Sequence, residues 1–111
     1  DSPQKVQSQD LLLGVKVMNE DTAFREGELM VAVYVKNIGN LKAKDLKLRI
    51  TILDEFITEE KTVPTLSPGK TTRVVFYLPL NEDIGAYEYY LRTTLAVDNS
   101  KKAKYSQVRL G

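Results

Sequence analysis

The segment DLKLRITI, residues 45–52, decides the fold because its side chains alternate strictly between polar and aliphatic. In a β-strand successive side chains point to opposite faces, whereas a helix repeats its apolar face about every 3.6 residues. The aliphatic residues therefore share one face of a strand: Leu46, Leu48, Ile50 and Ile52. A strand with one buried and one wet face is typical of an antiparallel sheet.

The same period of two continues outward from this segment in both directions. Turn residues separate the alternating stretches at intervals of about 8–12 residues, which is the spacing of a sandwich. The six further expected strands are 11–18, 28–37, 57–63, 72–78, 86–98 and 104–110. A helical turn over residues 54–61 is an alternative to the fourth strand. No connection is long enough for the crossover helix of a parallel sheet. We therefore expect an all-β fold, an immunoglobulin-like antiparallel β-sandwich of about seven strands.

Length and composition fit one folded domain. The chain has 111 residues, of which 42% are hydrophobic and 28% charged, a balance unlike that of disordered proteins. Residues 1–10 are polar and without period, so we expect them to be a flexible leader or linker before a sandwich domain over 11–111.

Charge and residue types exclude several classes of function. The net charge is only +1, so no strong field attracts nucleic acid or an anionic membrane. No apolar run approaches the ~20 residues that span a bilayer, so we expect no direct membrane insertion. If the domain is exported, we expect its targeting segment to lie outside this chain.

The sequence contains no recognisable catalytic set. Histidine and cysteine are both absent, which removes the commonest general base, the thiol nucleophile and thiolate metal ligands. Ser67 and Lys70 fit a turn better than a nucleophile–base pair, and Glu59 with Glu60 fits solvated edge charge. The acidic clusters 19–21 and 81–83 offer the oxygen ligands that calcium prefers, but they lack the spacing of a calcium-binding loop. We expect no enzyme activity, no cofactor and no metal site.

One outer face is unusually apolar for a surface exposed to water. In immunoglobulin-like topology the first, second and fifth strands share a sheet. The apolar residues at their outward positions are Leu12, Met18, Met30, Ala32, Tyr34, Val75 and Tyr77. Lys16, Lys36 and Arg73 are the main interruptions of this face. A contiguous apolar patch usually marks an interface. Its central members form the candidate interaction face: Met30, Tyr34, Val75 and Tyr77.

Basic residues are expected on the outer face of the other sheet. They are Lys47, Arg49, Arg92 and Arg109, with Tyr90 among them. Because Glu88 lies on the same face and the net charge is near zero, we interpret them as a solvated surface and expect no nucleic-acid partner.

Three short segments resemble a known family. They are VKNIGN with the following AKDL (35–40 and 43–46), LSPG (66–69), and GAY running on to VDN (85–87 and 97–99). Together they resemble the CARDB-type domains, immunoglobulin-like modules of bacterial and archaeal secreted and cell-surface proteins. The resemblance covers about residues 11–110 and departs after residue 99, where lysines follow in place of the family's acidic stretch. By analogy with other sandwiches, Tyr87 is a candidate structural corner, with a simple core ring as the alternative.

The resemblance and the missing catalytic set imply a non-catalytic extracellular or cell-surface module for domain spacing or protein–protein interaction. Its expected partners are neighbouring domains, further copies of itself or another surface protein. Two alternatives are a self-assembling surface-layer or filament subunit and a carbohydrate-binding or enzyme-accessory module.

Overall fold

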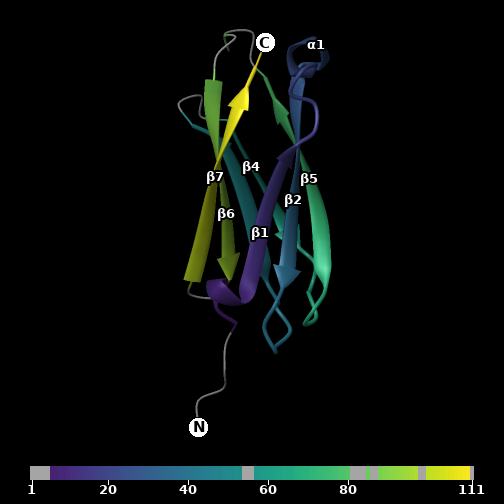
Figure 1. Cartoon of the computed structure of the whole chain (residues 1–111), viewed down its shortest axis with the longest axis vertical. Coiled ribbons are helices and arrows are strands. Elements are labelled where there is room, and N and C mark those ends of the chain that lie inside the picture. Colours follow the sequence, from purple (N-terminus) through teal and green to yellow (C-terminus); the bar gives the residue numbers. More distant parts are fainter. Residues whose placement is uncertain (1–5, 54–56, 81–84, 86–87, 98–99, 111) are drawn as a thin grey trace.

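The computed structural model describes residues 6–53, 57–80, 85, 88–97 and 100–110. These residues form seven strands and two short helical segments (Figure 1). The strands are β1 (Leu11–Val17), β2 (Glu28–Asn37), β3 (Leu46–Ile52), β4 (Ile57–Val63), β5 (Thr71–Pro79), β6 (Glu88–Val97) and β7 (Ser100–Arg109). The helical segments are the 3-10 helix η1 (Ser8–Asp10) and α1 (Ala23–Glu26).

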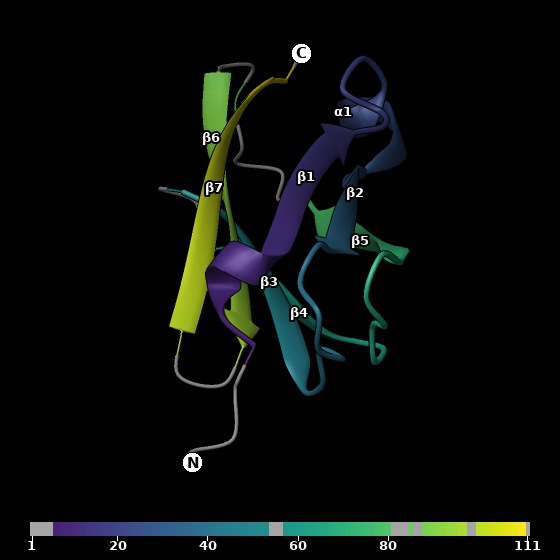
Figure 2. The same cartoon turned by 60° about the horizontal axis from the view of Figure 1, so that its bottom comes forward.

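The strands form two antiparallel sheets that pack face to face. One sheet has the order β1-β2-β5 and the other the order β4-β3-β6-β7. The two layers are seen nearly edge-on in Figure 2. The all-β sandwich is confirmed, and so is the placing of the first, second and fifth strands in one sheet.

The core lies between the sheets and consists of the aliphatic positions of the alternating strands. Val33, Ile50, Phe76 and Leu91, one from each of four strands, are all fully buried. The pairing Val31↔Phe76 places aliphatic and aromatic groups beside each other on the inner face. Burial of such side chains contributes about 1.5–3 kcal/mol each, which makes this layer the main source of stability.

The last strand is longer than the sequence predicts. It begins at Ser100 and not near Lys104. The alternation misses this start because the inner positions in the first half of the strand are polar. Register places Lys102 beside Leu95 and Lys104 beside Thr93, on the side of β6 that faces the core. The sequence pattern therefore does not predict the first half of this strand, because its inner positions lack apolar side chains.

One local feature also differs from the expectation. The turn region before β2 contains the helix α1, which buries Ala23 and ends at Gly27, a residue with φ of 78°. A left-handed residue at that position is the usual helix terminator, and glycine adopts it without strain. The expected fourth strand over 57–63 is confirmed, because residues 57–61 are extended and not helical, while residues 54–56 lie outside the described part.

Residues 6–10 pack on the domain, although the sequence suggests that they belong to a leader. Val6 is 7% exposed and joins the core. The Ser8 backbone N–H donates to Ser100 Oγ at 2.9 Å, and the Ile38 N–H donates to the Asp10 carbonyl at 2.9 Å. Residues 1–5 are outside the described part of the chain.

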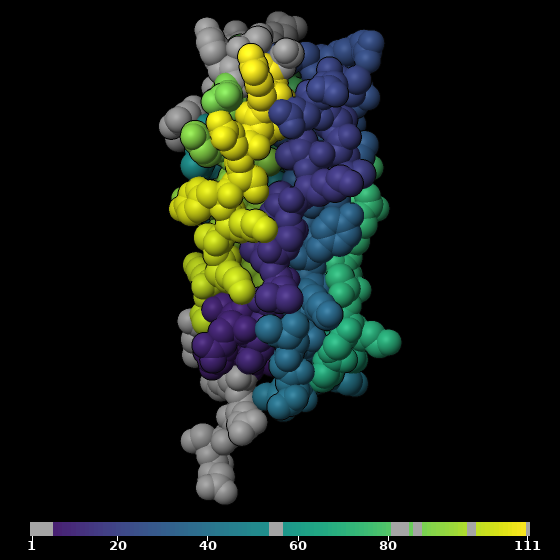
Figure 3. All heavy atoms as spheres, in the orientation of Figure 1, coloured from purple at the N-terminus to yellow at the C-terminus, as the bar shows by residue number. Residues whose placement is uncertain are grey.

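Polar side chains join the two sheets at both long edges. On one edge, where Figure 3 shows β7 lying directly against β1, Lys102 Nζ donates to the Leu11 carbonyl at 2.7 Å. Near the end of the same edge, Glu20 Oε1 accepts from the Arg109 backbone N–H at 2.9 Å. On the opposite edge, Lys61 Nζ of β4 donates to the Val75 carbonyl of β5 at 2.6 Å.

Candidate functional site

The candidate interaction face lies on the outer side of the β1-β2-β5 sheet. Met30 stands directly opposite Tyr77, and the next outward pair along the strands is Ala32 with Val75. Tyr34 follows one position further, opposite Arg73. The predicted adjacency of Met30, Tyr34, Val75 and Tyr77 is therefore present in the register. Figure 3 shows β1, β2 and β5 side by side on this surface.

Exposure differs along this face. Tyr77 and Leu12 are each 48% exposed, while Met30, Tyr34 and Val75 are half-buried. The prediction for Ala32 was wrong in one respect, because this residue is on the outward side but fully buried. A single methyl group flanked by longer side chains is covered by them. The face is thus a closed apolar layer, not a row of separate side chains.

Basic side chains border the apolar layer. Lys16 stands opposite Ala32, Arg73 opposite Tyr34, and Lys36 opposite Leu12. Glu28, at the far end of β2, is the acidic residue at the outward positions of the three strands. The face therefore presents an apolar centre inside a mainly positive border.

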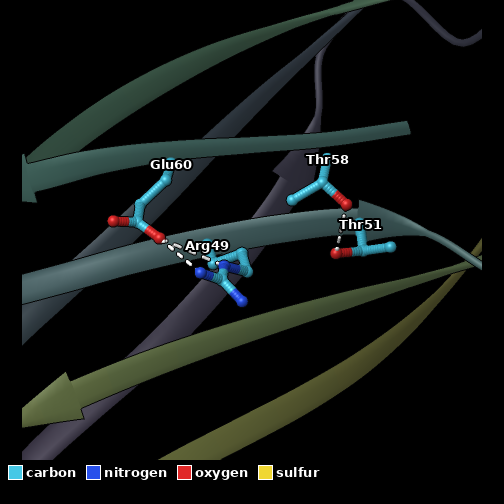
Figure 4. A network of polar contacts seen from close by, with 4 residues as sticks. All are labelled: Arg49, Thr51, Thr58 and Glu60. Atoms are coloured by element: carbon cyan, nitrogen blue, oxygen red, sulfur yellow. Dashed lines mark hydrogen bonds and ion pairs between the residues drawn. The ribbon is translucent and has the colours of Figure 1, made fainter. Parts of the chain in front are cut away.

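The outer face of the β4-β3-β6-β7 sheet is chemically different. Lys47, Arg49 and Arg92 occupy outward positions on β3 and β6, as the sequence predicts. Arg49 Nη2 and Nε donate to Glu60 Oε2 on β4 at 2.8 and 3.1 Å (Figure 4). These contacts with the Arg49 guanidinium lower the pKa of the Glu60 carboxyl below its ordinary value. Beside this ion pair, the hydroxyls of Thr51 and Thr58 lie 3.1 Å apart.

A tyrosine of β6 makes the backbone contacts expected of a structural corner, while the candidate at Tyr87 stays a prediction. Tyr87 is outside the described residues. Two positions later, the Tyr89 hydroxyl donates to the Gly85 carbonyl at 2.9 Å and accepts from the Gly85 N–H at 3.0 Å. Tyr89 is only 8% exposed, so one side chain both fills the core and binds the Gly85 backbone. Its inward place in the alternation of β6 was the available signal.

Asn19 and Glu20 of the acidic cluster at 19–21 make hydrogen bonds within the fold. Asn19 Oδ1 accepts from the Met30 N–H at 2.6 Å, and its amide donates to Glu26 Oε2 at 2.6 Å. Hydrogen bonds from Asn19 and Thr22 lower the pKa of Glu26. Residues 81–83 lie outside the described part. Among the described residues, no three His, Cys, Asp or Glu side chains are grouped to hold a metal ion.

Comparison with protein families decides what this sandwich is. The family model described as CARDB matches residues 8–105, nearly the whole chain. This chain belongs to the CARDB family. CARDB is a non-catalytic domain family, and its members occur in secreted or cell-surface proteins. No helix in the described part of this CARDB domain is long and apolar enough to cross a membrane.

Solved structures share the architecture of this CARDB domain. The FixG-related protein from Vibrio parahaemolyticus matches with a TM-score of 0.66 and 12% identity, over 91% of this chain and 96% of that one. A β-glucuronidase from Bacteroides uniformis matches with a TM-score of 0.52 and 20% identity, over 91% of this chain but 13% of the enzyme. These identities show a shared fold alone. No curated protein sequence matches the chain.

Proposed function

We propose that this domain is a non-catalytic module of an exported protein and that the outer face of its β1-β2-β5 sheet docks on a neighbouring protein domain. The observation that carries the proposal is the continuous apolar layer formed by Met30, Val75 and Tyr77 in cross-strand register. Met and aromatic side chains are enriched at the cores of protein interfaces.

The border charges favour a partner domain over a second copy of this chain. Lys16, Lys36 and Arg73 surround the apolar centre, against Glu28 alone. A partner with an apolar centre and an acidic border complements this pattern, whereas an identical face brings mainly like charges together. The similarity to a stretch of a much longer β-glucuronidase chain supports a module that sits among other domains.

The apolar face also fits a spacer that holds its neighbour at a fixed angle. A layer of half-buried side chains on a rigid sheet loses little conformational entropy when it is covered. A flexible loop surface pays that entropy on binding. Rigid docking of this kind orients one domain against the next, which is the interaction role that the sequence predicts.

Side-chain footprinting in the full-length protein tests this proposal. Hydroxyl radicals should modify Tyr77 and Met18 in the isolated domain, where they are 48% and 41% exposed, but much less in the full-length protein. Tyr90 and Tyr105, 53% and 61% exposed on the other sheet, are the matched controls and should react equally in both. Equal reactivity of Tyr77 in the two samples contradicts the proposal.

A double variant gives the second arm of the test. Tyr34→Lys with Tyr77→Lys should keep the β-sheet circular dichroism spectrum, because both rings point away from the core, and should remove the protection of Met18. Tyr90→Lys with Tyr105→Lys is the control of equal charge. Concentration-dependent protection in the isolated domain, with sedimentation showing oligomers, would overturn docking to a neighbour in favour of a self-assembling subunit.

A further inference from the structure

The outer face of the four-stranded sheet contains a groove of about 570 Å³. Its floor is made of short side chains on β6 and β7, namely Thr94, Ala96 and Ala103. Thr94 and Ala103 are direct cross-strand neighbours, so two short side chains meet across the β6–β7 pair. Longer side chains on both sides of this floor form the walls. The hollow is therefore built by residue size and not by a loop.

The walls of the groove are cationic. Lys47 and Arg49 rise from β3, Lys101 from β7, and Arg92 stands at one end of the floor. The lining carboxylate is Glu60, which already accepts two hydrogen bonds from Arg49. Four cations face one carboxylate here, although the whole chain carries a net charge of only +1. The sequence pattern places Lys47, Arg49 and Arg92 on one solvated outer face, and the structure gathers them with Lys101 around one hollow.

The positions of these cations favour a ligand with several negative charges along its length. Lys47 and Lys101 stand on either side of Ala96, on strands separated by one strand, hence about 10 Å apart at the backbone. Lys47 and Arg49 are two residues apart on one strand, about 7 Å. A single small anion contacts one or two of these groups, whereas an extended polyanion contacts all of them.

An exposed aromatic ring adds a flat apolar surface to the groove. Tyr105 lines the wall on β7, is 61% exposed and is the cross-strand neighbour of Arg92. A ring and a guanidinium side by side suit a ligand with an apolar face and an acidic substituent in the same unit. A sugar ring that bears a carboxylate has both.

We propose that this groove binds an acidic polysaccharide whose sugars carry carboxylates. The Arg92 guanidinium pairs with a sugar carboxylate through two parallel N–H···O bonds, and the Tyr105 ring packs against the same sugar. Lys47 and Lys101 hold the neighbouring carboxylates from opposite walls. Glu60 keeps Arg49 in a fixed orientation, and its carboxylate accepts hydrogen bonds from sugar hydroxyls.

Two other polyanions fit the groove less well. An acidic peptide has no ring that packs against Tyr105 while its own carboxylate pairs with Arg92, whereas a sugar carboxylate offers both in one unit. Single-stranded nucleic acid needs a row of aromatic rings for successive bases, and Tyr105 is the ring that lines this groove.

Titration calorimetry with polygalacturonate oligosaccharides tests the proposal, with the methyl-esterified oligosaccharides as the neutral match. We expect binding to the acid form, no binding to the ester, and weaker binding as salt rises. Arg92→Gln and Tyr105→Ala should each weaken binding at least tenfold. Lys16→Gln and Lys36→Gln, on the opposite face, are the charge-matched controls and should leave the affinity unchanged. Circular dichroism verifies that each variant is folded.

The test separates this proposal from the alternatives and from the docking face. Equal affinity for polyglutamate or oligothymidylate, with no effect of Tyr105→Ala, would overturn the assignment in favour of an acidic peptide or nucleic acid. No binding of polygalacturonate at low salt would also overturn it. Because the docking variants at Tyr34 and Tyr77 lie on the other sheet, they should bind polygalacturonate normally, so either proposal can fail without the other.

Discussion

The two outer faces of this sandwich arise from the same alternating pattern and yet differ completely in chemistry. On the β1-β2-β5 sheet, Met30 meets Tyr77 across the strands and forms a closed apolar layer. On the β4-β3-β6-β7 sheet, Thr94 meets Ala103 and leaves a hollow between cationic walls. Alternation decides which side chains point outward, but folding hardly constrains what they are. The outward positions are therefore the part of the sequence that reports on binding.

The largest expected effect on stability comes from a substitution in the core, which supports both outer faces. Phe76→Ala should lower the free energy of unfolding by about 3–5 kcal/mol, because this fully buried ring leaves a cavity between the sheets. Chemical denaturation monitored by circular dichroism measures the change. The neighbouring outward ring is the control, and Tyr77→Ala should change stability by about 1 kcal/mol or less. A loss below about 1 kcal/mol for Phe76→Ala would contradict a common core.

A smaller effect should be confined to one end of the three-stranded sheet. The fully buried Asn37 side chain donates to the Leu41 and Leu66 carbonyls at 2.7 and 2.9 Å and accepts from the Gly39 N–H at 2.9 Å. Asn37→Ala removes these bonds and should cost about 1–3 kcal/mol.

Hydrogen exchange shows which part of the domain loses stability in Asn37→Ala. The amides at the end of β2 should exchange faster in Asn37→Ala, while those of β3 and β6 under the groove should keep their protection. Asn40→Ala, an exposed residue of the same turn, is the matched control and should alter neither region. Uniform acceleration in both sheets would show that the two faces do not loosen separately.

Acid should lower the stability of the fold by protonating Glu60 on the outer face of the four-stranded sheet. Arg49 lowers the pKa of this carboxyl in the folded state, so the ion pair stabilises the fold above the ordinary pKa of a glutamate. That stabilisation is lost as pH falls through the folded-state pKa. The effect is small because both side chains are well exposed. Denaturation midpoints between neutral pH and pH 3 should fall less for Glu60→Gln than for Glu59→Gln, and identical pH profiles would contradict the coupling.

The smallest expected effect is none. The thermal unfolding midpoint should be the same in calcium and in excess chelator, since we predict no metal site on either face. Differential scanning calorimetry measures both conditions. A rise of several degrees with calcium would reveal a site that stabilises the folded state, and residues 81–83 would be the first to substitute.

The sequence predicts this molecule well wherever a residue's role depends on its own strand. The inward positions Val33, Ile50, Phe76 and Leu91 follow from alternation alone, and all are buried. Known sandwich topology then supplies the sheet that β1, β2 and β5 share. Prediction fails where the inner face of a strand is polar, as in the first half of β7, because the usual apolar signal is missing.

The groove could not be predicted from the sequence, for a different reason. Its floor depends on Thr94 and Ala103 becoming neighbours, and its walls on Lys47 and Lys101 lying on either side of Ala96. These are properties of the pairing register between strands and not of any one segment. The basic residues were visible in the sequence, but the short residues that turn them into a site become meaningful only once the strands are aligned.

The lysines that join the two sheets also protect the sheet edges from pairing with strands of other molecules. Lys61 and Lys102 occupy inner positions of the edge strands β4 and β7, beside Leu48 and Leu95, and reach across to carbonyls of β5 and β1. An incoming strand from another molecule would have to displace these ammonium groups and bury them without a partner. Copies of this domain at high concentration should therefore resist edge-to-edge aggregation and strand exchange.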